Sequence, residues 1–574
     1  MPNEYARLKT KYEEGMDRMH PWQEYPRPSL VRESYINLNG EWDFCISEQA
    51  PTVYTDSILV PFCPECELSG YKKEINENTP LHYRRIFTLP ENFKKDRVIL
   101  HFGAVDTIAE VMVNGKAVGT HEGGYLPFSY DITDALVYGE NELYVKVTDN
   151  LDVRYPYGKQ TKKRGGMWYT PVSGIWQTVW LESVCENYIK KIKITTDMRS
   201  AKITVTGGNE KKRLTLDDDG EVIEFTGDTV TVVPKNIQLW SPEDPYLYYF
   251  TLECGEDKIE SYFALREVGI GEFNGIKRLT LNGEPYLFNG LLDQGYFPDG
   301  LFLPATVKGY EDDILTAKRL GYNMLRKHIK VEPEIFYNLC DSLGIVVFQD
   351  MVNNSSYSFF FDTALPSAGL KSLPDKLRHR NKDSRRIFKQ SMIKTIDHLY
   401  NFPSILYYTV FNEGWGQFCA DEMYGVAKEC DGTRIIDATS GWFVRKLSDV
   451  DSRHVYFKPI KIKKPPKRPI VISEFGGYSH RVTGHLFGKG NYGYSTYSDR
   501  AAFEDAFIRL YEGEVSPLIA KGVSALVYTQ ISDVEDETNG LLTYDRAVLK
   551  VSVDRTKATM QGLYNNFKEE TKAK

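Results

Sequence analysis

The pattern of apolar residues changes near Gly275, and this change restricts the fold of the 574-residue chain more than any other feature. Before it, segments such as 108–113 and 142–147 alternate apolar and polar residues, as half-buried strands do. After it, short apolar runs alternate with amphipathic segments of helical length. The chain should therefore begin with β-sheet domains and end with repeated βα units around a parallel sheet.

Two β-domains are expected in the first part. Residues 1–185 contain several alternating segments, the hairpin signal Asn114-Gly115 and no amphipathic segment of four helical turns, which predicts an all-β sandwich. Residues 186–271 repeat the pattern on a smaller scale, with short strands separated by Gly- or Asp-rich turns. That length and strand density predict a seven-stranded, immunoglobulin-like sandwich.

Residues 272–574 are predicted to form a (β/α)8 TIM barrel, because they contain eight candidate strands with helices between them. The candidate strands are 286–291, 323–325, 345–348, 406–411, 434–436, 455–457, 470–472 and 525–529. The candidate helices are 310–320, 333–343, 384–399, 417–430 and 502–521. An open, doubly wound sheet is the alternative, but no Gly-rich phosphate-binding loop follows the first strand.

Composition and charge argue against several classes of protein. The net charge of −8 disfavours a protein that binds nucleic acid through its overall charge. The apolar runs are far shorter than the ~20 residues of a membrane span, and the first residues lack the apolar core of a signal peptide. We expect a cytoplasmic protein with no nucleic-acid or membrane partner. Eight cysteines are too few for a disulfide scaffold, and Cys63-Pro-Glu-Cys66 has no second pair for a zinc site.

Two glutamates stand where barrel enzymes keep their chemistry, directly after candidate strands. Glu413 follows the fourth strand in Asn412-Glu-Gly-Trp-Gly, and Glu474 follows the seventh in Ser473-Glu-Phe-Gly-Gly. Glycoside hydrolysis requires such a pair, one carboxyl protonated to assist the leaving oxygen and one ionised to attack the anomeric carbon. Each glutamate alone could instead end a strand in a salt bridge. Two of them, each beside an aromatic residue and glycines, favour catalysis.

These motifs and others resemble glycoside hydrolase family 2, which contains β-galactosidases, β-glucuronidases and β-mannosidases. The resemblance spans nearly the whole chain. It is carried by Leu38-Asn-Gly-Glu-Trp-Asp-Phe, Val60-Pro-Phe, Val113-Asn-Gly-Lys, Gly174-Ile-Trp-Gln-Thr-Val-Trp-Leu-Glu, Asn401-Phe-Pro-Ser-Ile, Phe411-Asn-Glu-Gly-Trp-Gly-Gln-Phe and Ile472-Ser-Glu-Phe-Gly. The resemblance implies a jelly-roll, sugar-binding-like domain, an immunoglobulin-like domain and a catalytic barrel, with the segment 166–169 reaching over the barrel mouth.

The resemblance also implies roles for individual residues. Glu413 would be the general acid/base, and Glu474 the nucleophile that forms a glycosyl-enzyme intermediate. Asn412 would bind the 2-hydroxyl of the sugar. Arg326 would keep the nucleophile ionised, since a positive charge within ~4–6 Å lowers a carboxylate pKa, although it could instead be a structural ion-pair partner.

Further candidates for substrate binding lie beside the predicted strands. They are Trp415, Trp442 and Tyr528, which could stack on sugar rings or belong to the core, and Asp293, His454 and Tyr456, whose orientation the sequence does not give.

Departures from the family pattern bear on the substrate. Bacterial β-glucuronidases of the family bind the sugar carboxylate with an Asn-x-Lys pair in the loop after strand eight, and this chain lacks that pair. The loop instead contains acidic residues that would repel a uronate, namely Asp533, Glu535, Asp536 and Glu537. The metal ligands that large β-galactosidases carry after strand three are replaced by Met351-Val-Asn-Asn-Ser-Ser. We therefore expect neither a metal nor another cofactor.

Together with the glutamate pair, the resemblance implies a retaining exo-β-glycosidase, and the commonest activity of the family indicates β-galactosides as its substrates. A β-glucuronidase or β-mannosidase is the nearest alternative, and a homo-oligomer is compatible with the family. A carbohydrate-binding protein without activity is a different class of alternative, but both glutamates are present. An inverting hydrolase is a third, and it would need carboxyl groups ~6.5–9.5 Å apart instead of ~5–5.5 Å.

Overall fold

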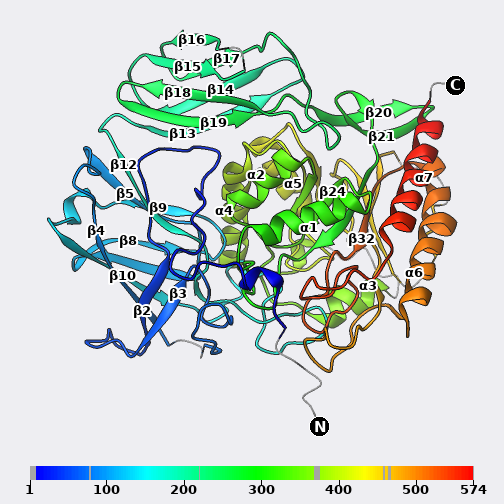
Figure 1. Ribbon diagram of the computed structural model, residues 1–574. Helices are drawn as coiled ribbons and strands as arrows, with labels where there is room; N and C mark the ends of the chain where they lie inside the picture. The colour runs from blue at the N-terminus through cyan, green and yellow to red at the C-terminus, as the bar shows by residue number, and fades with distance from the viewer. Residues whose placement is uncertain are drawn as a thin grey trace.

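The computed structural model describes residues 8–75, 79–218, 220–367, 375–456, 459–462 and 467–572. Two β-sheet regions lie against a barrel that is surrounded by helices (Figure 1). The first region occupies one side of the barrel, and the second packs across its top in the view of Figure 1. The predicted architecture of two sandwiches and a TIM barrel is confirmed.

The first region is a sandwich of two antiparallel sheets with a common core. One sheet has the order β1 (Tyr35–Asn37), β12 (Val179–Val184), β5 (Arg97–Phe102), β9 (Phe128–Asp131). The other has the order β3 (Asp56–Val60), β2 (Gly40–Ile46), β4 (Leu81–Thr88), β10 (Glu140–Thr148), β7 (Ile108–Val113), β8 (Lys116–Glu122). Side chains such as Trp42 and Leu181 fill the space between the sheets. The strands β6 (Val105–Asp106) and β11 (Gly174–Ile175) form a separate two-stranded sheet whose Val105 and Ile175 belong to the same core.

The predicted hairpin at Asn114-Gly115 is confirmed. These two residues connect β7 to β8 and have φ angles of 50° and 74°. Positive φ at both central positions gives a turn whose twist matches that of the flanking strands, and Asn and Gly adopt it at little cost.

The second region has the seven strands that the sequence predicts. Three of them form a sheet of order β13 (Ile189–Thr196), β14 (Ala201–Gly207), β17 (Thr229–Val232). The other four have the order β16 (Val222–Phe225), β15 (Lys212–Leu216), β18 (Tyr248–Cys254), β19 (Asp257–Phe263).

A small sheet that the sequence analysis did not predict follows. It consists of β20 (Val268–Phe273), β21 (Ile276–Leu281) and β22 (Glu284–Pro285). Leu279 and Leu281 of β21, together with Trp240, share an apolar cluster with Met324, Val346 and Leu406 of the barrel strands. This cluster closes the N-terminal end of the barrel, so the opposite end is the open mouth.

The barrel contains eight parallel strands in one sheet. Their order is β27 (Ile435–Asp437), β26 (Ile405–Thr409), β25 (Val346–Asp350), β24 (Met324–Lys327), β23 (Phe288–Asp293), β32 (Val523–Thr529), β29 (Ile470–Gly476), β28 (Asp451–Val455). The hydroxyl of Ser452 in β28 donates to Oγ of Ser440, which follows β27, at 3.4 Å. This hydrogen bond connects the first and last strands of the order and closes the barrel.

Helices surround the barrel and cover its strands (Figure 1). The α-helices are α1 (Lys308–Arg319), α2 (Glu334–Leu343), α3 (Leu365–Ser367), α4 (Lys382–Leu399), α5 (Ala420–Cys430), α6 (Arg500–Arg509) and α7 (Val553–Thr571). The shorter or irregular elements are η1 (Lys11–Glu13), η2 (Thr133–Ala135), η3 (Phe359–Ala364), η4 (Asp375–Leu377), η5 (Leu510–Val515), η6 (Ser516–Lys521), β30 (Tyr478–Ser479) and β31 (Ser495–Thr496). Within the described residues, no helix combines the length and apolar character of a membrane span.

Two predicted elements differ from the structure. The sixth strand runs over Asp451–Val455 instead of 455–457, and Phe457 lies outside the described residues. Its residues alternate between buried and half-buried, and the buried ones are the polar Ser452 and His454, so a search for apolar runs misses it. The predicted helix 502–521 is divided into α6, the π-helical η5 and the 3-10 helix η6, which contains Pro517.

A buried arginine joins the two sandwiches. Arg32 bonds Glu182 of β12 through one guanidinium nitrogen (3.0 Å) and Asp257 of β19 through two others (3.0 and 2.9 Å). All three side chains are at most 5% exposed. A charge buried in this way depends on its partner, because water cannot replace the lost interaction.

We expect the substitution Arg32→Ala to destabilise the protein by about 3–5 kcal/mol, since it leaves Asp257 buried without its cation. Denaturant unfolding followed by circular dichroism and fluorescence measures this loss. Arg84→Ala is the matched control: Arg84 pairs with Asp43 at 2.7 Å, but their side chains are 34% and 42% exposed, so the change should be below about 1 kcal/mol. Equal effects would contradict an interdomain role of Arg32.

Candidate active site

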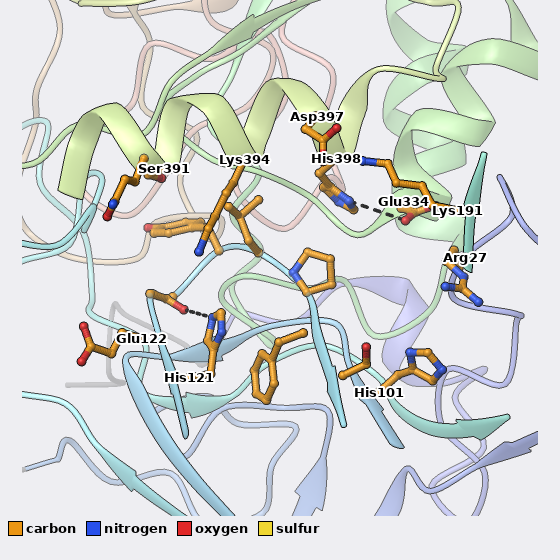
Figure 2. A pocket seen from close by; sticks show the side chains of 18 of the residues that line it. Arg27, His101, His121, Glu122, Lys191, Glu334, Ser391, Lys394, Asp397 and His398 are labelled. Carbon is orange, nitrogen blue, oxygen red and sulfur yellow. Dashed lines mark hydrogen bonds and ion pairs between the residues drawn. The ribbon is translucent and has the colours of Figure 1, made fainter. Parts of the chain in front are cut away.

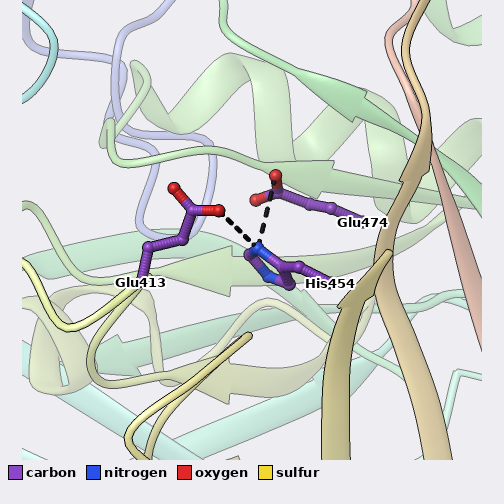
Figure 3. Close-up of side chains that lie close together, drawn as sticks. All are labelled: Glu413, His454 and Glu474. Atoms are coloured by element: carbon purple, nitrogen blue, oxygen red, sulfur yellow. Dashed lines mark hydrogen bonds and ion pairs between the residues drawn. The ribbon is translucent and has the colours of Figure 1, made fainter. Parts of the chain in front are cut away.

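Glu413 and Glu474 meet at the open end of the barrel. Glu413 follows β26 and has a φ of 52°, and Glu474 lies near the C-terminal end of β29. One carboxylate oxygen of each and Nδ1 of His454 all lie within 4.8 Å of one another. Figure 3 shows the imidazole of His454 between the two carboxylates. The strand ends thus bring together two acids that are 61 residues apart in sequence.

Arg326 of β24 binds Glu474 of this acid pair. Its guanidinium donates to Glu474 Oε1 (3.1 Å), Asn412 Oδ1 (2.9 Å) and Asp350 Oδ1 (3.0 Å). Burial alone would raise the pKa of Glu474, but its interactions with His454 and Arg326 lower it to about 2. Glu474 is therefore ionised at neutral pH, although its side chain is only 7% exposed.

Tyr456 and His454 complete the contacts of the two carboxylates. The Tyr456 hydroxyl donates to Glu474 Oε2 and lies 3.0 Å from Thr529 Oγ1. His454 Nδ1 lies 2.8 Å from Glu413 Oε1 and 3.6 Å from Glu474 Oε2. Both oxygens of Glu474 therefore accept hydrogen bonds from side chains of the barrel.

The three residues Glu413, His454 and Glu474 are of types that ligate metals, and their spacing would admit an ion. Their hydrogen bonds describe a different arrangement, because Glu474 is already bound by Arg326 and Tyr456 and His454 is in direct contact with Glu413. After strand three, Asn353 and Asn354 donate to backbone carbonyls of Trp415 and Ser384. These amides hold together the loops around the end of strand three.

A loop of the first sandwich reaches the barrel mouth. The ring of Trp168 packs edge-to-face against those of Trp415 (5.1 Å) and Tyr357 (5.0 Å). The backbone N–H of Tyr157 donates to Asn353 O (3.1 Å), which fixes the start of the loop on the barrel. Trp415 donates its Nε1–H to Ser355 O (2.9 Å), so its indole is held within this contact.

The acidic loop after β32 is bound by the same first-domain loop. Glu535 accepts from Thr170 N (2.8 Å), Glu537 accepts from the Tyr169 hydroxyl, and Asp533 pairs with Lys550 (2.6 Å). Burial raises the pKa of Glu535 to about 7 and that of Asp533 to about 6. The loop therefore carries less negative charge near neutral pH than its sequence suggests, which weakens the expected repulsion of a uronate.

The other residues that the sequence suggested for substrate binding differ in their burial and their contacts. Trp442 donates its Nε1–H to Glu413 O (2.9 Å), and its ring contacts that of His454. Asp293 pairs with Lys327 (2.6 Å), which also binds Glu332, so its carboxylate belongs to a buried ionic network. Tyr528 is fully buried against Phe475, Phe507 and Tyr511 of the strand–helix layer. The sequence could not separate these environments, because a residue at a strand end can face either side.

Sequence reasoning missed a tyrosine pair at the mouth. Tyr494 stacks on Tyr456 with ring centroids 3.7 Å apart, and Tyr492 lies next to it at 5.9 Å. Both follow β29 in a segment rich in glycine and tyrosine, Gly488 to Tyr497, which is the only signal that could have pointed to them.

A separate cavity of about 630 Å3 lies where the two sandwiches meet α4. Figure 2 shows Lys394 of α4 reaching toward His121 of β8 across it. Neither Glu413 nor Glu474 lines this cavity, so it is distinct from the acid pair.

Comparison with known proteins agrees with the fold. Residues 60–195 match the description "Glycosyl hydrolase 2 galactose-binding domain-like", residues 185–266 match "Glycosyl hydrolases family 2", and residues 277–539 match "Glycosyl hydrolases family 2, TIM barrel domain". Three domain types that share one family name, in the order seen in the structure, define the class: a multidomain glycoside hydrolase with a barrel. The chain belongs to glycoside hydrolase family 2.

Some relatives of the chain are named β-galactosidase and others β-glucuronidase. The chain is 30% identical over 351 residues to a β-galactosidase of Thermoanaerobacter pseudethanolicus, covering 55% of this chain and 46% of that protein. The chain is 24% identical to a β-galactosidase of Halalkalibacterium halodurans, and the alignment covers 81% of this chain and 50% of that protein. The chain thus spans about half the length of these relatives. A solved β-D-glucuronidase of Dictyoglomus thermophilum has the same fold, with a TM-score of 0.73, 20% identity and coverage of 94% and 98%.

The raised pKa of Glu535 predicts a pH-dependent stability. Because the folded protein raises this pKa from 4.5 to about 7, the stability that the group contributes is present below about pH 4.5 and is lost as the pH rises through 7. We expect Glu535→Gln, which keeps an acceptor for Thr170 N, to gain stability over the wild type between pH 5 and 7, by at most about 1.4 kcal/mol per pH unit.

Denaturant midpoints at pH 5, 6, 7 and 8 measure this difference. The exposed Glu122, replaced by Gln, provides the control and should show no such trend. A constant difference between Glu535→Gln and the wild type across this range would contradict the assignment.

Proposed function

We propose that this chain is a retaining, exo-acting β-glycosidase in which Glu474 is the nucleophile and Glu413 the general acid/base. The observation that carries the proposal is the asymmetry of the acid pair. Glu474 is bound by Arg326 and Tyr456 and has its pKa lowered to about 2, whereas Glu413 is the more exposed of the two, at 17%.

The asymmetry assigns one role to each acid. Ionised Glu474 attacks the anomeric carbon while Glu413 gives its proton to the departing glycosidic oxygen, so the C–O bond breaks and a glycosyl ester forms. Water then attacks the same carbon, Glu413 takes a proton from that water, and Glu474 leaves as a carboxylate. Two inversions at one carbon give net retention. Carboxylate oxygens within 4.8 Å support this course, because an inverting pair is separated widely enough to admit a water.

Asn412 is proposed to bind the 2-hydroxyl of the sugar. Its Oδ1 accepts from Arg326 at 2.9 Å, which orients the amide. Its Nδ2–H makes no hydrogen bond within the described part of the chain and can donate to a ligand. Arg326 thereby fixes both the nucleophile and the neighbouring donor. Such preorganised donors stabilise charge and strain that develop only in the transition state.

β-Galactosides are the first candidate substrates, and their support is the β-galactosidase names of the relatives in sequence. β-Uronides are a second candidate. The charge of Lys159, in the first-domain loop, acts to lower the pKa of Glu537 in the acidic loop and that of His328 in the barrel. Lys159 makes no hydrogen bond or ion pair with its side chain among the residues that the structure describes. A cation with these surroundings suits the carboxylate of a uronate.

Removal of each glutamate should have a different effect. We expect Glu474→Ala to abolish hydrolysis, and added azide to yield a glycosyl azide of inverted configuration. Glu413→Ala should lower kcat/KM by about 10²–10⁴-fold for poor leaving groups but little for dinitrophenyl glycosides, which need no proton.

The rates and the anomeric configuration of the azide products check both expectations. Glu504→Ala, a buried acid on α6, serves as the control for loss of a carboxylate elsewhere in the barrel. Activity in Glu474→Ala comparable to that of the control would remove the nucleophile assignment.

A panel of nitrophenyl β-glycosides separates the two substrate candidates. If galactosides are the substrates, Lys159→Met should change kcat/KM on the galactoside by less than about threefold. If uronides are, the same substitution should lower kcat/KM on the uronide by about 10-fold or more, as expected for loss of a charge-assisted hydrogen bond. Lys162→Met in the same loop is the control. Turnover of neither sugar above the Glu474→Ala blank would contradict both candidates.

A further inference from the structure

The imidazole of His454 lies within hydrogen-bonding distance of the proposed acid/base, Glu413. We propose that His454 is a positioning residue for Glu413: its Nδ1–H binds Oε1 of the carboxyl and leaves Oε2 as the oxygen that gives and takes the catalytic proton. This inference rests on the proposed function, because it presumes that Glu413 is the acid/base.

The hydrogen bonds of His454 determine which nitrogen carries its hydrogen. Nδ1 lies 2.8 Å from Glu413 Oε1, and an ionised carboxylate can only accept, so Nδ1 donates. Nε2 lies 2.9 Å from Ser440 Oγ, and this hydroxyl can donate to it. Both ring nitrogens therefore have a hydrogen-bond partner, and the His454 side chain is completely buried.

The ring has little freedom to move from this position. A Cβ atom at Gly441, whose φ is +93°, would lie 2.9 Å from both Cγ and Nδ1 of His454. The backbone of Gly441 thus packs directly on the imidazole, and the indole of Trp442 contacts it at 5.6 Å. Because the same Trp442 donates to Glu413 O, the backbone and the carboxyl of Glu413 are fixed by neighbouring groups.

One arrangement of His454 serves both halves of the proposed reaction. When Glu413 is protonated on Oε2, Oε1 is a carbonyl oxygen that accepts from Nδ1–H. When Glu413 has lost that proton, Oε1 is a carboxylate oxygen and still accepts from the same N–H. The histidine therefore needs no change of tautomer, and the proton is directed to the oxygen that faces the sugar.

The nucleophile is the second group within reach of this N–H. Glu474 Oε2 lies 3.6 Å from Nδ1, beyond a good hydrogen bond, and accepts instead from Tyr456. His454 is thus committed to Glu413 and not shared equally. Loss of the imidazole should consequently affect proton transfer most, because Glu474 keeps its hydrogen bonds from Arg326 and Tyr456.

The test compares four variants on substrates with good and poor leaving groups. His454→Leu fills similar space without a donor. His454→Asn can place an amide N–H where Nδ1 stands, whereas His454→Gln reaches instead toward the position of Nε2. Ser440→Ala removes only the partner of Nε2.

We expect His454→Leu and His454→Gln to lower kcat/KM on alkyl glycosides by about 10–100-fold, and to change it less than about threefold on dinitrophenyl glycosides, which need no acid. His454→Asn should recover at least about tenfold of that loss. Ser440→Ala should show a smaller effect in the same direction. For His454→Leu and His454→Gln on dinitrophenyl glycosides, kcat and KM should fall together. The reason is that hydrolysis of the glycosyl-enzyme intermediate, in which Glu413 acts as the base, is slowed and the intermediate accumulates.

Equal losses on both kinds of substrate, or no recovery with Asn relative to Gln, would overturn the inference. Thermal unfolding of each variant identifies a general loss of structure, and the Asn–Gln pair remains decisive if the Leu variant does not fold, because both are polar and of similar size. Glu413→Ala, measured in parallel, separates this failure from that of the proposed function: if it also lacks any leaving-group dependence, Glu413 is not the acid/base.

Discussion

The guanidinium of Arg326 is the interaction on which the barrel mouth depends. It is 1% exposed and binds three side chains from the ends of β25, β26 and β29, together with the carbonyl of Ser473 in β29. Without this cation, Asp350 and Glu474 would be two buried negative charges close together, which a protein interior does not tolerate. With it, Glu474 is kept ionised in a nearly dry site and Asn412 is oriented beside it. The same contact thus stabilises the barrel mouth and prepares its chemistry.

Much of the architecture could be predicted from the sequence, because it follows from local periodicity. Strand and helix patterns gave both sandwiches, the Asn114-Gly115 turn and seven of the eight barrel strands to within a few residues. The sixth strand was misplaced because its buried side chains, Ser452 and His454, are polar and serve the site instead of the apolar core. The sheet formed by β20 and β21 was missed because its role, closing the barrel, is apparent only in three dimensions.

The candidate site was predictable only where a residue type and a strand end coincide. Glu413, Glu474 and Asn412 satisfy that condition, and the structure brings them together with Arg326. His454 and Tyr456 were named without an orientation, and their contacts with the two carboxylates come from the barrel's curvature. Trp168, Tyr494 and Lys159 stand in long loops, where no periodicity indicates which way a side chain points. Tyr528 also stands at a strand end, but its side chain packs against the surrounding helices, so its strand-end position was misleading.

The loop from Tyr157 to Thr170 belongs to the first sandwich by sequence and to the barrel mouth by contact. Glu413 and Glu474, in contrast, are held almost entirely by barrel residues. Under the proposed function, the loop that would contact a ligand and the acids that would cleave it are encoded in different domains. Substitutions in the loop could then change the accepted sugars in evolution while the acid pair is inherited unchanged. For the same reason, a barrel expressed alone would keep its acids but lack the loop that contacts its mouth.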